Sequence, residues 1–430
     1  MPKHIPKPFT IIFGKAVRQA ARLRGGSGSA LPGLFVEKID PDFVPRTLKK
    51  LPQGVVVISG TNGKTTTTKM VVSLLESQGL KVFTNRTGSN FVRGVAAALL
   101  GEISVTGKLN ADIAVLELDE AHAVKFVNVV KPRFSLLLNV LRDQLDRFGE
   151  IDTTRTMLKV IAENTTQTVV LNGTDTRVSS IADTLKKEQT VEYFGLDSSL
   201  LGYFPSDDSH HTKNTPTTLP QLPKAPLVTL KSFSQSSATY DVQETQHTTE
   251  LQLKGAYNIF NSAAALSLVL TITPNAKVEK LMKALAEITP AFGRGETFMV
   301  DDQPVELVLI KNPAGFKLGL SSYSPAGYAT LIAINDNYAD GRDMSWLWDV
   351  DFTSLKDHPV YTTGIRADDM ALRLHYDDVA LRSSDTDIQK SVTMLLQRHA
   401  NEPKRIYCTY TAMLAIRKHL AKYTKVEDIT

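Results

Sequence analysis

Short, mostly apolar runs alternate with helical patterns after residue 54. Residues 55–58, 113–118 and 134–138 have the length and composition of strands buried on both faces. Two further strands are expected at 81–84 and 169–172. Apolar residues recur at spacings of three and four between these runs, which predicts helices at 64–78, 92–100 and 121–130, and another from about Asp175. The alternation indicates βαβ crossovers, and hence an α/β fold with a mostly parallel, doubly wound sheet.

Residues 197–254 differ in composition, because Ser, Thr, Pro and His dominate the stretch. We interpret it as an insertion with a flexible start and, as one option, a small β unit over 227–252. Its histidines, His210, His211 and His247, have no obvious metal-ligand spacing, so solvent exposure is favoured over metal binding. Helical periodicity resumes at 257–270 and 278–288.

A second, smaller α/β domain is predicted beyond a hinge at 293–295. It holds strands near 305–310, 329–334 and 359–362 and a helix over 387–399. The predicted organisation is therefore a basic helix and linker at 1–42, a central domain at 43–292 and a C-terminal domain at 293–430.

The N-terminal segment is basic and amphipathic. Residues 1–36 contain six Lys or Arg and no acid. Such a helix could rest on an anionic membrane surface, or it could pack on its own domain with a solvated basic face. Glycines and serines at 25–29 would end it. The apolar residues that recur at helical spacing, with the bases on the other side, are Ile12, Ala16, Val17, Ala20 and Leu23.

Composition limits the function classes. The net charge of +4 over 430 residues is too mild to indicate nucleic-acid binding. The single cysteine, Cys408, excludes an intramolecular disulfide or a cysteine-based zinc cluster, and its apolar surroundings predict a buried structural thiol. Neither a spanning helix nor a signal peptide is expected, because the N-terminal apolar run, 9–13, is too short. A cytoplasmic protein is the expectation.

The strongest motif is the glycine-rich turn between the first strand and the first helix of the sheet. Glycines there let backbone N–H groups face a phosphate chain, Lys64 supplies a full positive charge, and the Thr65 hydroxyl can bind Mg²⁺. The turn is shorter than the usual G-x-x-x-x-G-K-T loop, because position 58 is Ile. The predicted ATP-binding residues are Gly60, Thr61, Asn62, Gly63, Lys64, Thr65 and Thr66.

Acidic residues follow the strand at 113–118, where a parallel sheet presents ligands. Glu117 is the first candidate to hold Mg²⁺ near the transferring phosphoryl group, with Asp119 or Glu120 as the alternative. Equally, acids at this position could cap the next helix.

Three motifs together resemble the Mur ligases and folylpolyglutamate synthetases. The loop 60–66 resembles their ATP loop, 255–261 is similar to their G-x-H/Y-N-x-x-N segment, and 292–296 to their G-R-x-E turn. These ligases phosphorylate a carboxylate with ATP, and an amine then attacks the acyl phosphate. The resemblance implies that Asn258 or Asn261 approaches the nucleotide and that Arg294 lies near the phosphates, although Asn258 could also cap the following helix.

From about residue 20 to its end, the chain is similar to one branch of that superfamily, the MurT family of ligase subunits from lipid II isoglutaminyl synthases. The segments 84–90, 312–316, 335–352 and 364–370 carry the similarity. It implies amidation of the D-glutamate α-carboxylate in the lipid II stem peptide, with ammonia from a GatD-like class I glutaminase subunit in a heterodimer. Asp349, in the W-x-W-D segment, would reach the partner and orient its catalytic histidine. Without the resemblance, this acid would be interpreted as a cap or a surface charge.

The chain also departs from this family. Many members carry a four-cysteine zinc ribbon in the central domain, whereas 197–254 has no cysteine, so no structural zinc is expected. Two other functions stay open: a stand-alone amino-acid ligase of the superfamily, and a nucleotide-gated module that only docks other enzymes. A peripheral position at the inner membrane face is the expectation for a lipid-borne substrate, and no nucleic-acid partner is expected.

Overall fold

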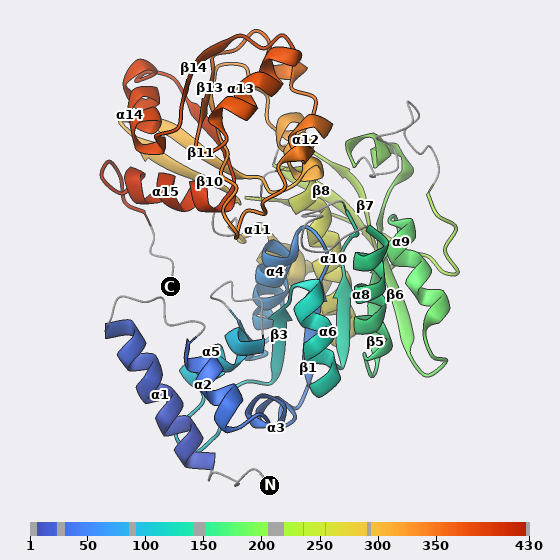
Figure 1. The fold of residues 1–430 in the computed structure, drawn as a ribbon. Helices are drawn as coiled ribbons and strands as arrows, with labels where there is room; N and C mark the ends of the chain where they lie inside the picture. Colours follow the sequence, from blue (N-terminus) through green and yellow to red (C-terminus); the bar gives the residue numbers. More distant parts are fainter. Residues whose placement is uncertain are drawn as a thin grey trace.

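Two sheets organise the chain, and each belongs to its own α/β domain (Figure 1). The structure is a computed structural model that describes residues 7–23, 31–85, 92–141, 151–204, 219–234, 236–253, 255–289 and 294–426. Within these ranges, no helix is long and apolar enough to cross a membrane.

The central domain is built on a nine-stranded sheet in the order β2-β3-β1-β4-β5-β6-β7-β8-β9. Strands from β2 to β7 pair in parallel, and β8 and β9 follow as antiparallel hairpins. The predicted parallel α/β sheet is therefore confirmed. Its strands are β1 Val55–Ser59, β2 Val82–Thr84, β3 Ile113–Glu117, β4 Phe134–Leu137, β5 Thr168–Asn172, β6 Thr190–Leu196, β7 Val228–Phe233, β8 Ser237–Val242 and β9 Thr245–Glu250.

Helices cover both faces of this sheet. Successive side chains of a strand point to opposite faces, so Val56 and Ile58 join one buried cluster and Val55 and Val57 join another. The first cluster contains α4 Lys64–Ser77, α10 Ala256–Ile272 and α11 Val278–Ala286. The second contains α2 Leu31–Ile39, α3 Phe43–Leu48, α5 Val92–Glu102, α6 Glu120–Val129 and α8 Ile151–Glu163. Helix α4, which follows the loop after β1, is therefore held in place by this buried core.

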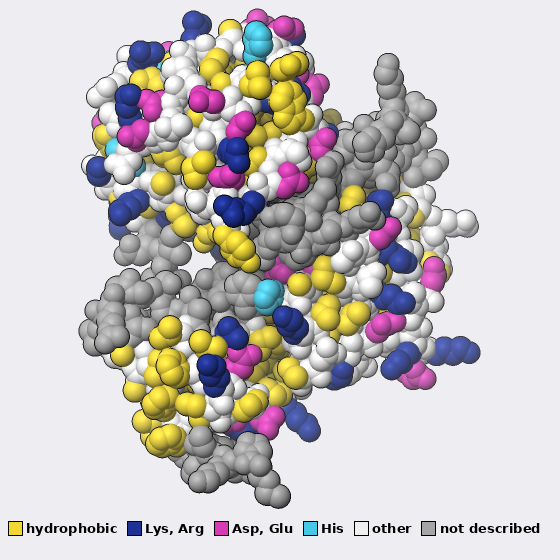
Figure 2. Space-filling model, in the orientation of Figure 1, with side chains coloured by type: hydrophobic (Ala, Val, Ile, Leu, Met, Phe, Trp, Pro, Cys, Tyr) yellow, Lys and Arg dark blue, Asp and Glu magenta, His cyan; other side chains and the backbone are white. Residues whose placement is uncertain are grey.

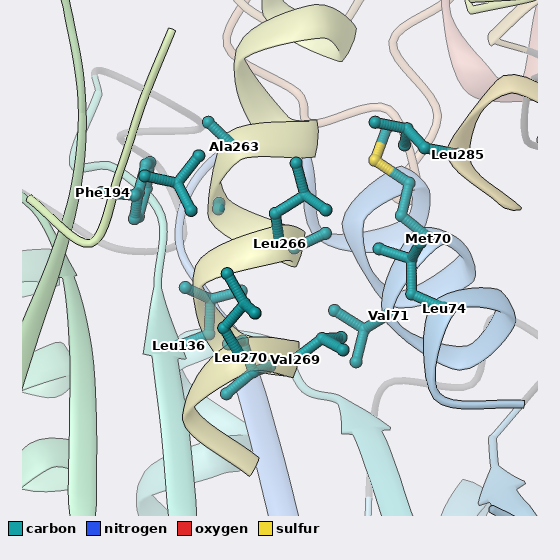
Figure 3. Close-up of a cluster of buried hydrophobic side chains, with 14 of the residues drawn as sticks. Met70, Val71, Leu74, Leu136, Phe194, Ala263, Leu266, Val269, Leu270 and Leu285 are labelled. Carbon is teal, nitrogen blue, oxygen red and sulfur yellow. The ribbon is translucent and has the colours of Figure 1, made fainter. Parts of the chain in front are cut away.

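Replacing Leu266 by alanine is expected to lower the free energy of unfolding by about 2–5 kcal/mol. Leu266 of α10 is fully buried and belongs to the same cluster as Met70 and Val71 of α4 (Figure 3). Its truncation would therefore leave a cavity between these two helices. Chemical denaturation would measure the change. The control is Val129→Ala at a 57% exposed position on α6, where a change within about 0.5 kcal/mol is expected. Equal losses in both variants would contradict this account.

The small β unit expected over 227–252 is present as strands β7 to β9, and these strands extend the central sheet. Strand β7 pairs in parallel with β6, beginning at Phe194 opposite Val228, and β8 and β9 add two edge strands. The signal is a period-2 pattern within a polar composition, because Ala238, Tyr240 and Val242 alternate inward along β8. His247 lies in β9 opposite Tyr240, while His210 and His211 lie outside the described residues.

Two other elements differ from the predictions. The helix expected from Asp175 is only α9, Thr176–Ser179, followed by the 3₁₀ helix Ser180–Thr184. Asp175 caps α9 by accepting hydrogen bonds from the backbone N–H groups of Arg177 and Val178, and burial raises its pKa. The predicted linker before residue 43 contains α2, which packs against α5.

Helix α1, Lys7–Leu23, does not pack on its domain through its most apolar face. A different face makes that contact. Ile11 is 3% exposed, and a side chain at Gly14 would collide with Leu100 of α5 and contact Val36 of α2. By contrast, Ile12 is 55% exposed. The helix therefore does rest on its own domain, as one of the two expectations had it, but it leaves apolar residues in solvent.

The C-terminal domain has a six-stranded sheet in the order β10-β11-β15-β12-β13-β14, with only β10 antiparallel. Cys408 is fully buried in β15, and burial raises the pKa of its thiol, which confirms a structural cysteine. The strands are β10 Arg294–Val300, β11 Gln303–Leu309, β12 Ala329–Ala333, β13 Val360–Thr363, β14 Leu381–Asp385 and β15 Lys404–Cys408. The helices are α12 Pro313–Ser322, α13 Ala367–Tyr376, α14 Ile388–Arg398 and α15 Tyr410–Leu420.

Candidate nucleotide site

The loop between β1 and α4 requires glycine at two positions. Gly60 has φ +136° and Gly63 has φ +87°, a region that side chains strongly disfavour. A Cβ at Gly60 would lie 3.0 Å from the Asn139 backbone nitrogen, and one at Gly63 would lie 2.5 Å from the Asn261 side chain. The turn therefore brings backbone close to two other segments and ends at the N-terminus of α4, as a phosphate site needs.

Lys64 is the first residue of α4, and its side chain is 9% exposed. Its ammonium donates to the Gly60 carbonyl at 2.5 Å and to the Thr61 carbonyl at 3.3 Å. It also lies 3.5 Å from both carboxylate oxygens of Glu120, itself 3% exposed. A buried charge needs such a partner. Glu120 thus compensates the positive charge of Lys64. This role differs from the alternative that the sequence offered for Glu120, which was to bind Mg²⁺.

Thr65 and Glu117 meet at the carboxyl end of β3. The Thr65 hydroxyl donates to Glu117 Oε1 at 2.8 Å. Asn85 fixes the Glu117 backbone, since its amide donates to the Glu117 carbonyl at 2.8 Å and its oxygen accepts from the Glu117 N–H at 3.0 Å. Asp119, in contrast, caps α6 by accepting from the Ala121 N–H, as the helix-cap alternative expected.

This pair of oxygen donors fits Mg²⁺. Among the described residues, no three His, Cys, Asp or Glu side chains gather as a metal cage. Magnesium does not require one, because it usually takes one or two protein oxygens and completes its shell with water and substrate phosphates. Thr65 and Glu117 are the residues that would hold it.

The segment after β4 clamps the ATP loop, which sequence reasoning missed. The Asn139 side chain accepts from the Asn62 N–H at 2.8 Å and donates to the Asn62 carbonyl at 3.0 Å. The Thr61 hydroxyl accepts from the Leu141 N–H at 3.0 Å. These contacts hold the outer part of the loop to the central sheet. In the sequence, Asn139 is recognisable only as an asparagine that follows a strand, and this pattern is too common to predict the contact.

The C-terminal domain reaches the same loop. Asn62 and Asn312 exchange two side-chain amide hydrogen bonds at 3.2 and 3.0 Å. Asn312 is fully buried and caps α12 by accepting from the Gly315 N–H. The Lys311 ammonium donates to the Thr61 carbonyl at 3.1 Å. A second positive charge therefore approaches the loop from the other domain, and sequence reasoning did not single it out.

A cavity of about 120 Å³ lies between the two domains beside this loop. Asn258 and Asn261 both line it from α10. The N-cap of α10 is Gly255, so Asn258 lies inside the first turn instead of at the cap. Arg294 begins β10, and its side chain is outside the described part of the chain. The cavity is lined from the loop, α10 and α12 by Asn62, Gly63, Gly255, Tyr257, Asn258, Asn261, Ala314, Leu318 and Tyr323, among others.

Replacing Lys311 by methionine is expected to weaken ATP binding about 10-fold to 100-fold, since a hydrogen bond to a charged group contributes about 1.5–3 kcal/mol. Calorimetric titration with ATP and Mg²⁺ would measure the affinity. Lys356→Met makes the same charge change at a surface ion pair with Asp378 in the same domain and should leave ATP affinity unchanged. An unaltered affinity in the Lys311 variant would remove that residue from the site.

Asp349 lies on the surface of the C-terminal domain, at the end of the 3₁₀ helix Ser345–Asp349. Arg373 of α13 anchors this turn by donating to the Val350 carbonyl at 2.6 Å. Trp348 is 50% exposed and contacts the exposed ring of Tyr376 at 5.2 Å. Asp349 is therefore an exposed acid that directly follows Trp348 on a turn anchored by Arg373.

Comparisons with known proteins agree with this architecture. Residues 58–269 match the Mur ligase middle domain, and residues 309–413 match the MurT ligase C-terminal domain. The lipid II isoglutaminyl synthase (glutamine-hydrolyzing) subunit MurT of Streptococcus pneumoniae is 32% identical over 434 residues, covering 93% of each chain.

Two solved structures show the same fold. The MurF ligase of Thermotoga maritima, in complex with ADP, has a TM-score of 0.66 at 15% identity and covers 91% of this chain and 83% of its own. The folylpolyglutamate synthase of Mycobacterium tuberculosis, complexed with ADP and AMPPCP, has a TM-score of 0.63 at 13% identity and covers 97% of this chain and 100% of its own.

Proposed function

The chain belongs to the MurT family of the Mur ligase superfamily, and on that premise we propose that it is the ATP-dependent ligase subunit of a lipid II isoglutaminyl synthase. It amidates the D-glutamate α-carboxylate of the lipid II stem peptide and so forms D-isoglutamine. The observation that carries the proposal is the ATP loop, where Lys64, Thr65 and Glu117 lie together at the junction with a MurT-type C-terminal domain.

The reaction proceeds in two steps. A carboxylate oxygen of the substrate forms a bond to the γ-phosphorus of ATP, the bond to the β-phosphate oxygen breaks, and ADP leaves. Ammonia then attacks the carbonyl carbon of the acyl phosphate, the carbon–oxygen bond to phosphate breaks, and the nitrogen gives up a proton. Ammonia must arrive unprotonated, because ammonium has no free electron pair to attack with.

The residues divide this work. Backbone N–H groups of the loop and the N-terminus of α4 bind the phosphates, and Lys64 offsets the negative charge that builds up during transfer. Thr65 and Glu117 would hold Mg²⁺, which supplies further neutralisation of the phosphate charge. Asn258, Asn261 and Arg294 are assigned to the nucleotide, and Lys311 positions the loop from the C-terminal domain.

The partner is a GatD-like class I glutaminase subunit in a heterodimer. The relative from Streptococcus pneumoniae is named as one subunit of a glutamine-hydrolyzing enzyme. Cys408, the chain's only cysteine, is fully buried with a raised thiol pKa and is unsuited to hydrolyse glutamine. Asp349 would complete the partner's Cys–His pair, because a carboxylate orients and stabilises a catalytic imidazole. The reaction takes place at the inner face of the membrane, where the lipid-borne substrate lies.

The test is to co-express the chain with a glutaminase-like protein encoded next to it, to purify the two together and to measure amidation. Lipid II, ATP and Mg²⁺ are supplied with either glutamine or ammonia, and the stem peptides are analysed by mass. Amidated peptide from both nitrogen sources is the expected result. Ligation of an amino acid by this chain alone, with no use of ammonia, would instead indicate a stand-alone ligase.

A further inference from the structure

The outer side of the two N-terminal helices carries exposed large apolar side chains. Phe9, Ile12 and Leu31 are each 55% exposed, and Phe35 is 40% exposed. The rings of Phe9 and Phe13 stack with their centroids 6.2 Å apart, and the rings of Phe13 and Phe35 meet edge-on with their centroids 6.3 Å apart. The two helices therefore form one continuous surface, the α1–α2 apolar face, defined by these five residues. Hydrophobic side chains gather along α1 in Figure 2, at the lower left.

Apart from the contact of Phe13 with Phe35, this surface does not hold α1 on its domain. The opposite side of the helix makes that contact, through the buried Ile11 and through Gly14, which lies against Leu100 and Val36. Exposed Ala16 and Ala20 continue the outer stripe. The members of the stripe, Phe9, Ile12, Phe13, Ala16 and Ala20, follow the i, i+3, i+4, i+7, i+11 spacing of one helix face.

The sequence around the face is basic. Residues 1–36 contain six Lys or Arg and no acid. Lys15 is partly exposed on α1 and Lys38 is exposed on α2, while the exposed acid of α2, Glu37, is paired with Arg93 at 2.6 Å. Electrostatic attraction acts over about 8–10 Å at physiological salt, comparable to the width of a helix. Bases beside or behind the stripe are therefore near enough to attract an anionic surface.

We propose that the α1–α2 apolar face docks on the surface of an anionic lipid bilayer. An apolar stripe that presents Phe and Ile, combined with flanking bases, is the pattern of a helix that lies in the membrane interface. The inference rests on the proposed function, because docking is useful only if the substrate is held in the bilayer. Docking would then bring the inter-domain site to that substrate.

The test is flotation of the full chain with vesicles of phosphatidylglycerol and phosphatidylethanolamine, compared with vesicles of phosphatidylcholine alone. We expect binding to the anionic vesicles that weakens with added salt. The double variant Ile12→Glu/Phe35→Glu should lose at least about tenfold in vesicle partitioning at an unchanged melting temperature. Met299→Glu, at a 54% exposed position on β10, is the matched control and should bind like the parent chain.

Activity separates this inference from the proposed function. The double variant should amidate vesicle-borne lipid II more slowly but a water-soluble analogue at the parental rate. Equal vesicle binding by parent and double variant, or none by the parent, would overturn the docking proposal. The proposal would also be overturned if the double variant no longer bound the glutaminase subunit, or no longer formed a dimer that the parent chain forms. The face would then be a protein-binding surface. A parent chain that floats with anionic vesicles yet amidates neither substrate would contradict the proposed function alone.

Discussion

Lys64→Ala is expected to reduce ATP-dependent amide formation at least about 10²-fold to 10³-fold, the usual cost of removing one group that stabilises transition-state charge. Lys64 is the full positive charge inside the loop, and its ammonium lies within hydrogen-bonding distance of the Gly60 carbonyl. The measurement is the initial rate of stem-peptide amidation with ammonia as the nitrogen source. Normal amide formation would favour a module that binds nucleotide and docks other enzymes without catalysis.

The buried ion pair complicates a single substitution. Removing Lys64 leaves Glu120 as an uncompensated buried charge, which typically costs 3–5 kcal/mol of stability. The double variant Lys64→Ala/Glu120→Gln removes both charges and should recover much of the lost stability. Activity should stay low in the double variant. Recovery of activity together with stability would mean that Lys64 acts only by holding the fold.

Asp349→Asn is expected to abolish amidation with glutamine and to leave amidation with ammonia at the parental rate. The substitution keeps the size of the side chain but removes the charge that a catalytic imidazole requires, an effect of about 10⁴-fold in hydrolases that use a carboxylate in this way. The measurement is glutamine hydrolysis and stem-peptide amidation by the co-purified complex, with each nitrogen source in turn.

Asp351→Asn is the matched control for that experiment. Asp351 lies on the surface two residues further along the same loop. Its carboxylate accepts from the Thr353 N–H and hydroxyl, which lowers its pKa. This variant should use both nitrogen sources normally. Equal loss of glutamine use in both variants would indicate a general charge effect, and loss of ammonia use in the Asp349 variant would place that residue in the ligase site.

Local features of the site could be predicted because they depend on neighbouring residues. A buried strand, two glycines and Lys64 specify the loop and the start of α4 within a few residues. The position of Glu117 also follows from sequence, because the carboxyl ends of adjacent parallel strands meet at one edge of the sheet. The role proposed for Asp349 comes only from the family resemblance, because no local pattern of residues indicates it.

The remaining features depend on contacts between distant segments. Lys311 and Asn312 reach the loop across 250 positions of sequence, and nothing in their own neighbourhood reveals this. A small β unit over 227–252 was expected, but its place at the edge of the central sheet depends on the pairing of β7 with β6, which the polar composition does not reveal. On α1, the apolar pattern identified a helix correctly, but it could not show which face its domain would cover.

The reciprocal amide pair between Asn62 and Asn312 joins the ATP loop directly to the C-terminal domain. If ATP favours the arrangement in which this pair is made, then a partner that favours the same arrangement must raise affinity for ATP by the factor by which ATP raises affinity for the partner. The glutaminase subunit and the nucleotide would then bind cooperatively to one chain.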